Sequence, residues 1–434
     1  MKKIYSLIIT LLILLPINVF SLDYPSINSK IVEVYDINDD KVLYEVDSNK
    51  QTSIASLTKI ATTITAIENI KNLDEQVTIT SNILSTVSSD ASKAGLKVGD
   101  KVTYRDLLYA SMLPSGADAT NSIAILSSGS IDNFVAKMNE LAKKLKLENT
   151  HFVNVTGLDK DGHYSSADDV RKLLNYALKN ELFRQIYTTK EYTLSNGLKV
   201  KSTVNDKYGK NNDVSKIIGS KTGYTGNAGY CLSSLSNING HEMLIIVLNA
   251  SHIGNNYYNI VDTVDLINFM NESYKDETLV KKGQLIKKIP VTLSKINSYN
   301  ILSTKDVKKY LPKDYDIKNL KIEYKGLNSL SFSNKKGEKI GSVKYYYEGK
   351  LITEEKVILN KEIKMDIIKV LKKYYYIIIG VILIIAGLIT YRIKTKKKKR
   401  WLNIWSEPQI VHFNHLYIIF YDLIYTITYY SILL

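Results

Sequence analysis

The spacing of hydrophobic side chains predicts two kinds of element in the first half of the chain. Residues 29–48 alternate apolar and polar side chains on both sides of the turn Asn38-Asp39-Asp40, which predicts a pair of strands. Residues 56–71 carry apolar side chains at helical spacing, with Ser or Thr at the start, which predicts a helix. The same helical pattern recurs in three later segments: 104–127, 132–146 and 170–180.

Strand-like segments return after these helices. Three of them are 217–221, 228–236 and 242–249. The last lies within HEMLIIVLNA, a continuous apolar run that is typical of a central buried strand. Residues 257–274 again have helical spacing and close the unit. The order of strand pair, helices, strands and helix predicts an α/β sandwich in which helices flank an antiparallel sheet.

The pattern changes again near residue 276. Short alternating runs such as IPVTL and KIGSVKYYY are separated by Gly, Asn and Lys up to about residue 365. We therefore expect a first domain at 22–275 and a small all-β domain at 276–365. No catalytic residue type clusters in the second domain, which suggests a spacer between the first domain and a membrane.

Apolar runs at the two ends place the chain at a membrane. Two lysines precede an apolar run at 4–15, which is too short to span a bilayer comfortably and is broken by Pro16. This pattern predicts a secretory signal at 1–21, with an uncleaved anchor as the alternative. Residues 374–391 contain no charge, have tyrosines at both edges and match the length of one transmembrane helix.

Charge sets the orientation of that helix. Lysines and an arginine at 394–400 follow it at once, and the positive-inside rule puts such a cluster in the cytoplasm. Residues 22–373 are then extracellular, and 392–434 form a basic cytoplasmic segment with an apolar tail to which we assign no role. The chain has 58 Lys and Arg against 43 Asp and Glu, a net charge of +15. We expect no nucleic-acid partner, because a basic cluster beside a membrane helix has this simpler cause.

Composition narrows the chemistry. The chain has 434 residues, 45% of them apolar, and can bury a large core. A single cysteine, Cys231, excludes an internal disulfide and a Cys-based zinc module, and we expect it to pack in the core. His241-Glu242 opens like a zinc-binding helix, but residue 245 is Ile, so the second ligand is missing. We expect no metal and no cofactor.

The first candidate motif is Ser56-Leu57-Thr58-Lys59, at the start of a predicted helix. A spacing of three puts Ser56 and Lys59 on one helical face. A serine hydroxyl needs a base, and lysine can be that base when burial and a nearby cation lower its pKa. A helix N-terminus also offers N–H groups to a developing oxyanion. On its own, the motif is a weak signal, and a capping serine followed by a surface lysine explains it more simply.

The second candidate motif is Lys221-Thr222-Gly223, on a predicted strand before a sharp turn that begins at Tyr224. A cation beside a hydroxyl suits a substrate carboxylate. Gly223 leaves space where another chain can pair with the strand edge. On its own, the tripeptide is a weak signal, because Lys-Thr-Gly is also an ordinary turn sequence.

The third candidate motif is Ser115-Gly116-Ala117, on a loop between helices. A serine in this position can relay a proton. The alternative is a plain helix cap supplied by Ser115 or Asp118.

In this order, the three motifs resemble the signature of penicillin-binding proteins and class A β-lactamases. Longer stretches resemble the D-alanyl-D-alanine carboxypeptidases of the low-molecular-mass penicillin-binding type: IASLTKIATT, LLYASMLPSGADAT, HFVNVTGLDKDGHYSSADDVRKLL and KTGYTGNAGYCL. SNKKGEKIGSVKYYYEGKLI resembles the C-terminal β-domain of that family. The resemblance covers roughly residues 24–365 and implies a β-lactamase/transpeptidase-like fold.

The resemblance implies a serine peptidase mechanism. Ser56 would attack the carbonyl between the two terminal D-alanines of a peptidoglycan stem peptide, with Lys59 as the base. Ser115 would pass a proton to the leaving D-alanine, and water would hydrolyse the acyl-enzyme. Penicillins and other β-lactam antibiotics should acylate Ser56 as substrate mimics.

The resemblance also implies how substrate is held. The oxyanion would lie between the backbone N–H groups of Ser56 and Tyr224. Lys221 and Thr222 would bind the terminal carboxylate of the stem peptide.

One position departs from the family pattern. The second motif of the family usually ends in Asn, which bridges the catalytic lysine and the substrate amide, but here the residue is Ala117. Asp118 is not a replacement, because a deprotonated carboxylate cannot donate. His151 and His163 are better explained as loop or cap residues than as acids or bases.

Alternatives to a carboxypeptidase remain on the same residues. A D,D-endopeptidase would use them on crosslinks. A β-lactamase shares the fold, but we find no convincing glutamate-bearing loop to activate a deacylating water. A non-catalytic wall-binding protein is the third alternative, and it depends on Ala117.

Overall fold

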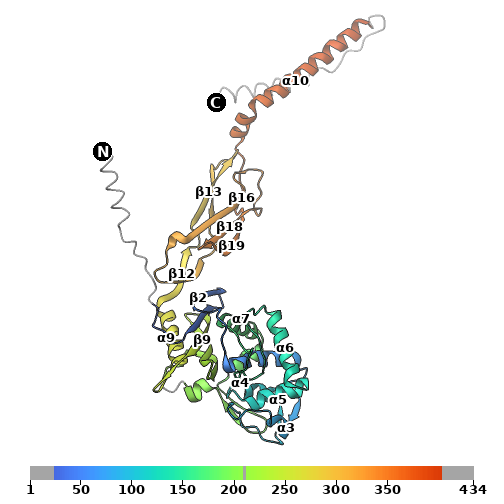
Figure 1. The fold of residues 1–434 in the computed structure, drawn as a ribbon. Helices are drawn as coiled ribbons and strands as arrows, with labels where there is room; N and C mark the ends of the chain where they lie inside the picture. The colour runs from blue at the N-terminus through green and yellow to red at the C-terminus, as the bar shows by residue number, and fades with distance from the viewer. Residues whose placement is uncertain (1–23, 209–211, 403–434) are drawn as a thin grey trace, which may run out of the picture. The chain divides into compact units, whose positions relative to one another are not determined.

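The computed structural model describes residues 24–208 and 212–402 (Figure 1). The predicted signal at 1–21 and most of the predicted C-terminal tail, from 403 on, lie outside the described residues. The chain forms two compact units. The first consists of the chain up to 283 with 304–321 and 345–353, and the second consists of 284–303, 322–344 and the chain from 354 on.

A five-stranded antiparallel sheet lies at the centre of the first unit, in the order β2-β1-β9-β8-β7. Its strands are β1 (Ile31–Asp36), β2 (Lys41–Val46), β7 (Ile217–Thr225), β8 (Gly229–Ile238) and β9 (His241–Ala250). Strand β7 therefore forms one edge of the sheet, with a backbone that can pair with an added chain.

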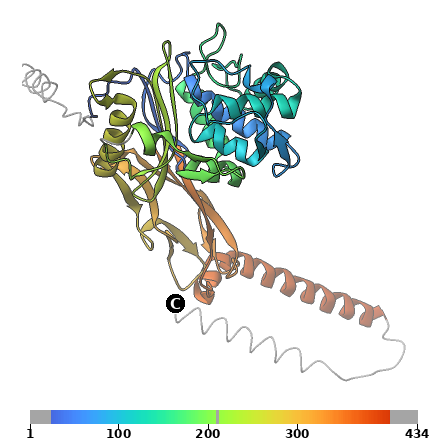
Figure 2. The ribbon, with the colours of Figure 1, turned by 90° about the horizontal axis from the view of Figure 1, so that it is seen from below.

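Helices cover both faces of this sheet, as Figures 1 and 2 show. Leu244 and Ile246 of β9 pack into the core shared with the larger group of helices, whereas Ile245 and Val247 pack into the core shared with α9. Because successive side chains of a strand point to opposite faces, β9 is apolar at nearly every position. The α/β sandwich predicted from the sequence is confirmed.

The larger helical group includes the short 3-10 turn η1 (Ala55–Thr58), which leads directly into α2. The helices of this group are α2 (Lys59–Asn69), α3 (Ser81–Leu84), α4 (Tyr104–Met112), α5 (Ala117–Ser128), α6 (Ile131–Lys144), α7 (Ala167–Ala177) and α8 (Glu181–Thr188). Helix α9 (Tyr258–Ser273) lies on the other face. A π-helical turn, η2 (Val204–Tyr208), precedes β7.

The prediction of one helix over 104–127 was wrong. The segment is two helices, α4 and α5, separated at 113–116. Pro114 lacks the N–H that an interior helical residue donates, and Ser115 has a left-handed φ of 66°. The interruption places Ser115 on a loop between the two helices.

Several short elements of the first unit were not predicted. They are β3 (Gln76–Thr78), β4 (Lys101–Thr103), β5 (Glu191–Thr193), β6 (Lys199–Lys201), β10 (His252–Ile253) and β11 (Asn256–Tyr257), besides α3, α8 and η2. They form isolated two-stranded pairs, β3 with β4, β5 with β6 and β10 with β11. Runs of two or three residues are too short to show a hydrophobic period.

The part of the chain after α9 is built from short strands. They are β12 (Tyr274–Val280), β13 (Leu285–Thr292), β14 (Ser298–Leu302), β15 (Val307–Pro312), β16 (Leu320–Gly326), β17 (Leu330–Ser331), β18 (Lys339–Tyr347) and β19 (Lys350–Ile358), with a 3-10 turn η3 (Ile317–Asn319). The strands pair as β12-β15, β14-β13-β17 and β16-β18-β19. This all-β segment was predicted from the alternating runs.

A single long helix, α10 (Ile367–Leu402), ends the described part of the chain. Within the described residues it is the one helix that is long and apolar enough to cross a membrane, over Ile367–Lys396. The apolar run predicted at 374–391 lies inside it.

Candidate active site

Ser56 and Lys59 meet at the start of α2. Ser56 lies in the 3-10 turn η1, and Lys59 is the first residue of the α-helix. The Lys59 ammonium donates a hydrogen bond of 2.9 Å to Ser56 Oγ and another of 2.7 Å to the Thr156 carbonyl. The side chain of Lys59 is 2% exposed. The Ser56 hydroxyl and the Lys59 amine, one helical turn apart in the sequence, are therefore in direct contact.

Burial changes the chemistry of Lys59. It lowers the pKa of this amine to about 7, and the charge of Asp118 opposes the shift. A substantial fraction of Lys59 is then neutral near pH 7, which is the form that can accept the Ser56 proton.

Lys221 and Thr222 face the same region from the edge strand β7. Lys221 is 1% exposed and donates a hydrogen bond of 2.8 Å to the Thr222 carbonyl. Burial and repulsion from the Lys59 charge hold the pKa of Lys221 well below its usual range. The Thr222 hydroxyl is 2.6 Å from the Thr203 hydroxyl, which orients it. A carboxylate that entered here would favour the charged form of Lys221.

Gly223 brings β7 against η1, the turn that carries Ser56. A Cβ at this position would lie 3.0 Å from the Ser56 backbone nitrogen and 3.0 Å from the Ala55 Cβ, closer than side chains normally pack. The next residue, Tyr224, is still part of β7, which ends at Thr225, so the turn follows Thr225 and does not begin at Tyr224 as predicted. Tyr224 is 55% exposed. The backbone nitrogens of Ser56 and Tyr224 thus belong to two segments in direct contact.

Ser115 lies on the interruption between α4 and α5 and is 5% exposed. Its Oγ has no hydrogen-bond partner among the residues that the structure describes. A buried hydroxyl without a partner is costly, and such groups occur where a ligand or substrate completes the site.

Asp118, one residue after Ala117, binds the loop at 94–96. Its carboxylate accepts hydrogen bonds from the backbone nitrogens of Ala94, Gly95 and Leu96, at 2.8, 2.9 and 3.0 Å. It acts on Lys59 through charge and does not take the place of an amide at position 117.

The segment between α6 and α7 contributes contacts that sequence reasoning missed. Besides the Thr156 carbonyl on Lys59, the Val155 carbonyl accepts a 2.8 Å hydrogen bond from Thr62. The Asp159 carboxylate accepts hydrogen bonds from the Thr225 hydroxyl and from the Asn227 backbone nitrogen. Backbone carbonyls carry no residue signal, so the stretch VTGLDKDG offered only its family likeness as a clue.

His163 supports η1, the turn that carries Ser56. Its Nδ1 accepts from the Val153 backbone nitrogen, so Nε2 carries the proton and donates to the Thr58 hydroxyl at 2.9 Å. Thr58 in turn donates to the Ala55 carbonyl. Burial and the nearby His151 lower the pKa of His163 to about 4, so this histidine is neutral near pH 7.

The other two singled-out residues lie apart from this chemistry. His151 is exposed, and its Nδ1 is 2.7 Å from the Gly162 carbonyl. Cys231 is fully buried in β8, and burial raises the pKa of its thiol to about 12. Cys231 packs in the core, as predicted.

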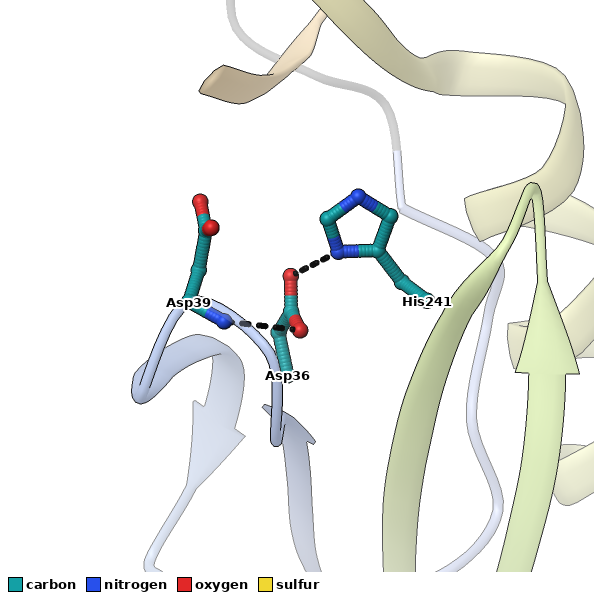
Figure 3. A group of neighbouring side chains, drawn as sticks. All are labelled: Asp36, Asp39 and His241. Atoms are coloured by element: carbon teal, nitrogen blue, oxygen red, sulfur yellow. Dashed lines mark hydrogen bonds and ion pairs between the residues drawn. The ribbon is translucent and has the colours of Figure 1, made fainter. Parts of the chain in front are cut away.

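Asp36, Asp39 and His241 form the one group of potential metal ligands among the described residues (Figure 3). Their donors already have partners. Asp36 accepts from His241 Nδ1 and from the backbone nitrogen of Asp39, and His241 Nε2 faces Asp276. The Lys309 ammonium lies 3.2 Å from Asp39 and supplies a positive charge. The arrangement is a hydrogen-bonded network that includes the ion pair between Lys309 and Asp39.

The sequence matches two families over these regions. Residues 18–252 match Peptidase_S11, described as D-alanyl-D-alanine carboxypeptidase, and 274–365 match the C-terminal domain of penicillin-binding protein 5. The chain belongs to the D-alanyl-D-alanine carboxypeptidase family. It is therefore a serine peptidase, and the resemblance drawn from its motifs is confirmed.

Curated relatives cover most of the chain. D-alanyl-D-alanine carboxypeptidase DacF of Bacillus subtilis is 31% identical over 75% of this chain and 83% of its own length. D-alanyl-D-alanine carboxypeptidase DacA of Escherichia coli is 29% identical over 78% of this chain and 84% of its own length.

Solved structures of the family share the fold. Penicillin-binding protein 5 of Haemophilus influenzae superposes with a TM-score of 0.57 at 25% identity, covering 79% of this chain and all of its own. The Streptomyces K15 DD-transpeptidase superposes with a TM-score of 0.52 at 32% identity, covering 57% of this chain and 98% of its own.

Proposed function

We propose that this family member is a carboxypeptidase that removes the terminal D-alanine from peptidoglycan stem peptides through an acyl-enzyme on Ser56. The observation that carries the proposal is the hydrogen bond between Ser56 Oγ and the buried amine of Lys59, whose pKa is lowered to about 7. A serine next to a base of this pKa is an activated nucleophile at neutral pH.

Acylation begins with proton transfer from Ser56 Oγ to the neutral amine of Lys59. The oxygen bonds to the carbonyl carbon between the two D-alanines, and the oxyanion accepts from the backbone N–H groups of Ser56 and Tyr224. The C–N bond then breaks. The leaving amine takes the proton from Lys59 by way of Ser115, whose buried hydroxyl is free to form these bonds.

Substrate lies along the edge strand β7. An extended peptide can pair with the free edge of this strand, and Gly223 lets the paired backbone approach Ser56. Lys221 and Thr222 bind the terminal carboxylate, which an internal peptide bond does not offer. This contact explains a preference for the chain terminus.

Deacylation regenerates Ser56. Water attacks the ester carbon while Lys59 accepts its proton. The bond to Ser56 Oγ then breaks, and Lys59 returns the proton to this oxygen. The shortened peptide leaves with a new carboxylate. A β-lactam would acylate the same serine, because its ring amide and carboxylate occupy the positions of the scissile bond and of the terminal carboxylate.

A D,D-endopeptidase is the second candidate. A D-alanyl-D-alanine endopeptidase of Escherichia coli is 29% identical over 52% of this chain and 73% of its own length. An endopeptidase would cut a crosslink with the same serine. The carboxypeptidase is favoured because the relatives that match the chain over its greater length are carboxypeptidases.

Two measurements test the proposal. A fluorescent penicillin should label the wild-type chain and should not label Ser56→Ala. Free D-alanine should then be released from a pentapeptide faster than a crosslinked dimer is cleaved. Labelling of Ser56→Ala would contradict the role of Ser56, and preferential cleavage of the dimer would favour the endopeptidase.

We further propose that α10 anchors the chain in the cell membrane, with the peptidase domain at 22–275 and the β-domain at 276–365 outside. Its support is the length and composition of α10 and the lysine cluster after residue 391. Protease added to intact protoplasts should remove the peptidase domain and leave a membrane-bound fragment. Protection of the peptidase domain would contradict this topology.

A further inference from the structure

The segment 154–163, between α6 and α7, contacts the active site at two separate places. Near its start, the Thr156 carbonyl accepts the hydrogen bond from Lys59. Further along, Asp159 Oδ1 accepts from the Thr225 hydroxyl at 2.8 Å, and Oδ2 accepts from the Asn227 backbone nitrogen at 3.1 Å. One short segment thus holds both the base and the turn that follows Tyr224.

The Asp159 carboxylate organises that turn. Thr225 donates its hydroxyl proton to Asp159 and accepts a hydrogen bond from the Ala228 backbone nitrogen at 3.1 Å. The Asn227 backbone nitrogen also donates to Asp159. The Asp159 carboxylate therefore binds a residue on each side of Gly226 in the turn. Tyr224, whose N–H is assigned to the oxyanion, is the residue directly before Thr225.

Hydrogen bonds within the segment 154–163 and close packing against η1 fix its position. Asn154 Oδ1 accepts from the backbone nitrogens of Thr156 and Gly157, and its amide donates to the Leu158 carbonyl. Gly157 has a φ of 85° and packs so tightly that a Cβ would lie 1.9 Å from the Ala55 carbonyl oxygen. Asp159 therefore belongs to a segment that is held firmly against η1, the turn that carries Ser56.

We propose that Asp159 is a positioning residue for the acylation step, which sets the distance between the N–H groups of Tyr224 and Ser56. The inference rests on the proposed acyl-enzyme chemistry at Ser56. Asp159 is exposed and acts through Thr225 and Asn227 on the geometry of the oxyanion site.

This role predicts a specific kinetic signature. Loss of one oxyanion donor lowers kcat by about 100- to 1000-fold in serine peptidases, and displacing a donor should cost less, about 10-fold. The contacts of Lys221 and Thr222 with the substrate carboxylate do not depend on the turn. Loss of Asp159 should therefore lower the acylation rate constant while the KM for the peptide stays within about 2-fold.

The test compares Asp159→Ala, Asp159→Asn and Thr225→Val by stopped-flow acylation with a penicillin and by D-alanine release. Asp159→Ala should acylate about 10-fold more slowly than wild type. Asp159→Asn should recover most of the rate, because its amide oxygen can accept from Asn227 while its NH₂ donates to Thr225. Thr225→Val should be slow, and adding Asp159→Ala to it should cost little more.

Asp161→Ala is the matched control, because Asp161 is an exposed aspartate two residues away with no hydrogen bond or ion pair among the described residues. It should acylate at the wild-type rate. A wild-type rate in Asp159→Ala, an equal loss in Asp161→Ala, a loss confined to KM, or independent effects of Asp159→Ala and Thr225→Val would each overturn the proposal. Thr225→Val also tests it if Asp159→Ala does not fold. Failure of the proposed function would show differently, as absence of Ser56 acylation in the wild type.

Discussion

Lys59 Nζ lies 2.9 Å from Ser56 Oγ and 2.7 Å from the Thr156 carbonyl oxygen. The first contact joins the proposed base to the proposed nucleophile within one turn of the chain. The second ties that base to a segment about a hundred residues away. The reactivity of the site therefore depends on a long-range backbone contact as well as on the local spacing of the motif.

The first prediction concerns pH. The pKa of Lys59 is lowered to about 7, and only the neutral amine can accept the Ser56 proton. The second-order rate constant for acylation by a penicillin should rise with pH through about 7 and then level off, because this parameter reports the free enzyme. Stopped-flow measurements from pH 5.5 to pH 9, about one and a half units below this pKa and two above it, would show the inflection.

Lys59→Arg is the matched variant for this profile. Arginine keeps a positive charge but stays protonated, so it cannot act as the base. Its acylation rate should fall by at least about 100-fold, with no inflection near pH 7. An unchanged inflection in this variant would show that another group carries the pH dependence.

The second prediction concerns Ala117, where the family pattern has Asn. In Ala117→Asn, the side-chain amide should restore a hydrogen bond to Lys59 and another to the substrate amide. One hydrogen bond to a charged group contributes about 1.5 kcal/mol, which corresponds to about a 10-fold increase in kcat/KM for D-alanine release. Ala117→Leu is the control, because leucine has a branched side chain like that of asparagine but forms no hydrogen bond. If Asn and Leu change kcat/KM equally, volume rather than hydrogen bonding governs the position.

Much of the fold could be predicted because its elements carry local signals. The continuous apolar run of β9 indicated burial on both faces, and Leu244 and Ile245 do join the cores on opposite sides of the sheet. Ser56 and Lys221 could be placed on elements because they occur next to clear helical or strand patterns, whereas Ser115 fell inside the segment that was wrongly predicted as one helix.

The supporting contacts could not be predicted in the same way. The Thr156 carbonyl would be present with any residue at that position, and Asp159 and Thr225 are 66 residues apart. The left-handed Ser115 also gave no periodic signal. These features arise from tertiary packing, which one sequence does not encode as a pattern.

The third prediction concerns His163. Burial lowers the pKa of this histidine to about 4, compared with an ordinary value of 6.5. The unfolded chain therefore takes up a proton at higher pH than the folded chain does. The stability that this neutral histidine contributes is present above about pH 6.5 and is lost as the pH falls from 6.5 toward 4.

Thermal melts at several pH values test this. The difference in melting temperature between wild type and His163→Gln should shrink on acidification through that window, because Gln does not titrate. His151→Gln is the control, since His151 is exposed, and it should follow the wild type. A constant difference between wild type and His163→Gln would contradict the burial of a neutral imidazole.

The fourth prediction separates backbone conformation from close packing. Gly157 and Gly197 have nearly the same left-handed φ, 85° and 87°, but a Cβ on Gly157 would lie 1.9 Å from the Ala55 carbonyl oxygen, whereas a Cβ on Gly197 meets nothing within 4 Å. Gly197→Ala should cost about 1 kcal/mol in the free energy of unfolding, the strain of a left-handed alanine. Gly157→Ala should cost more than about 3 kcal/mol, because backbone on both sides must move. Denaturant titration measures the free energy of unfolding of both variants. Equal costs would mean that Gly157 is required for its φ alone, and that the segment 154–163 does not pack tightly against η1.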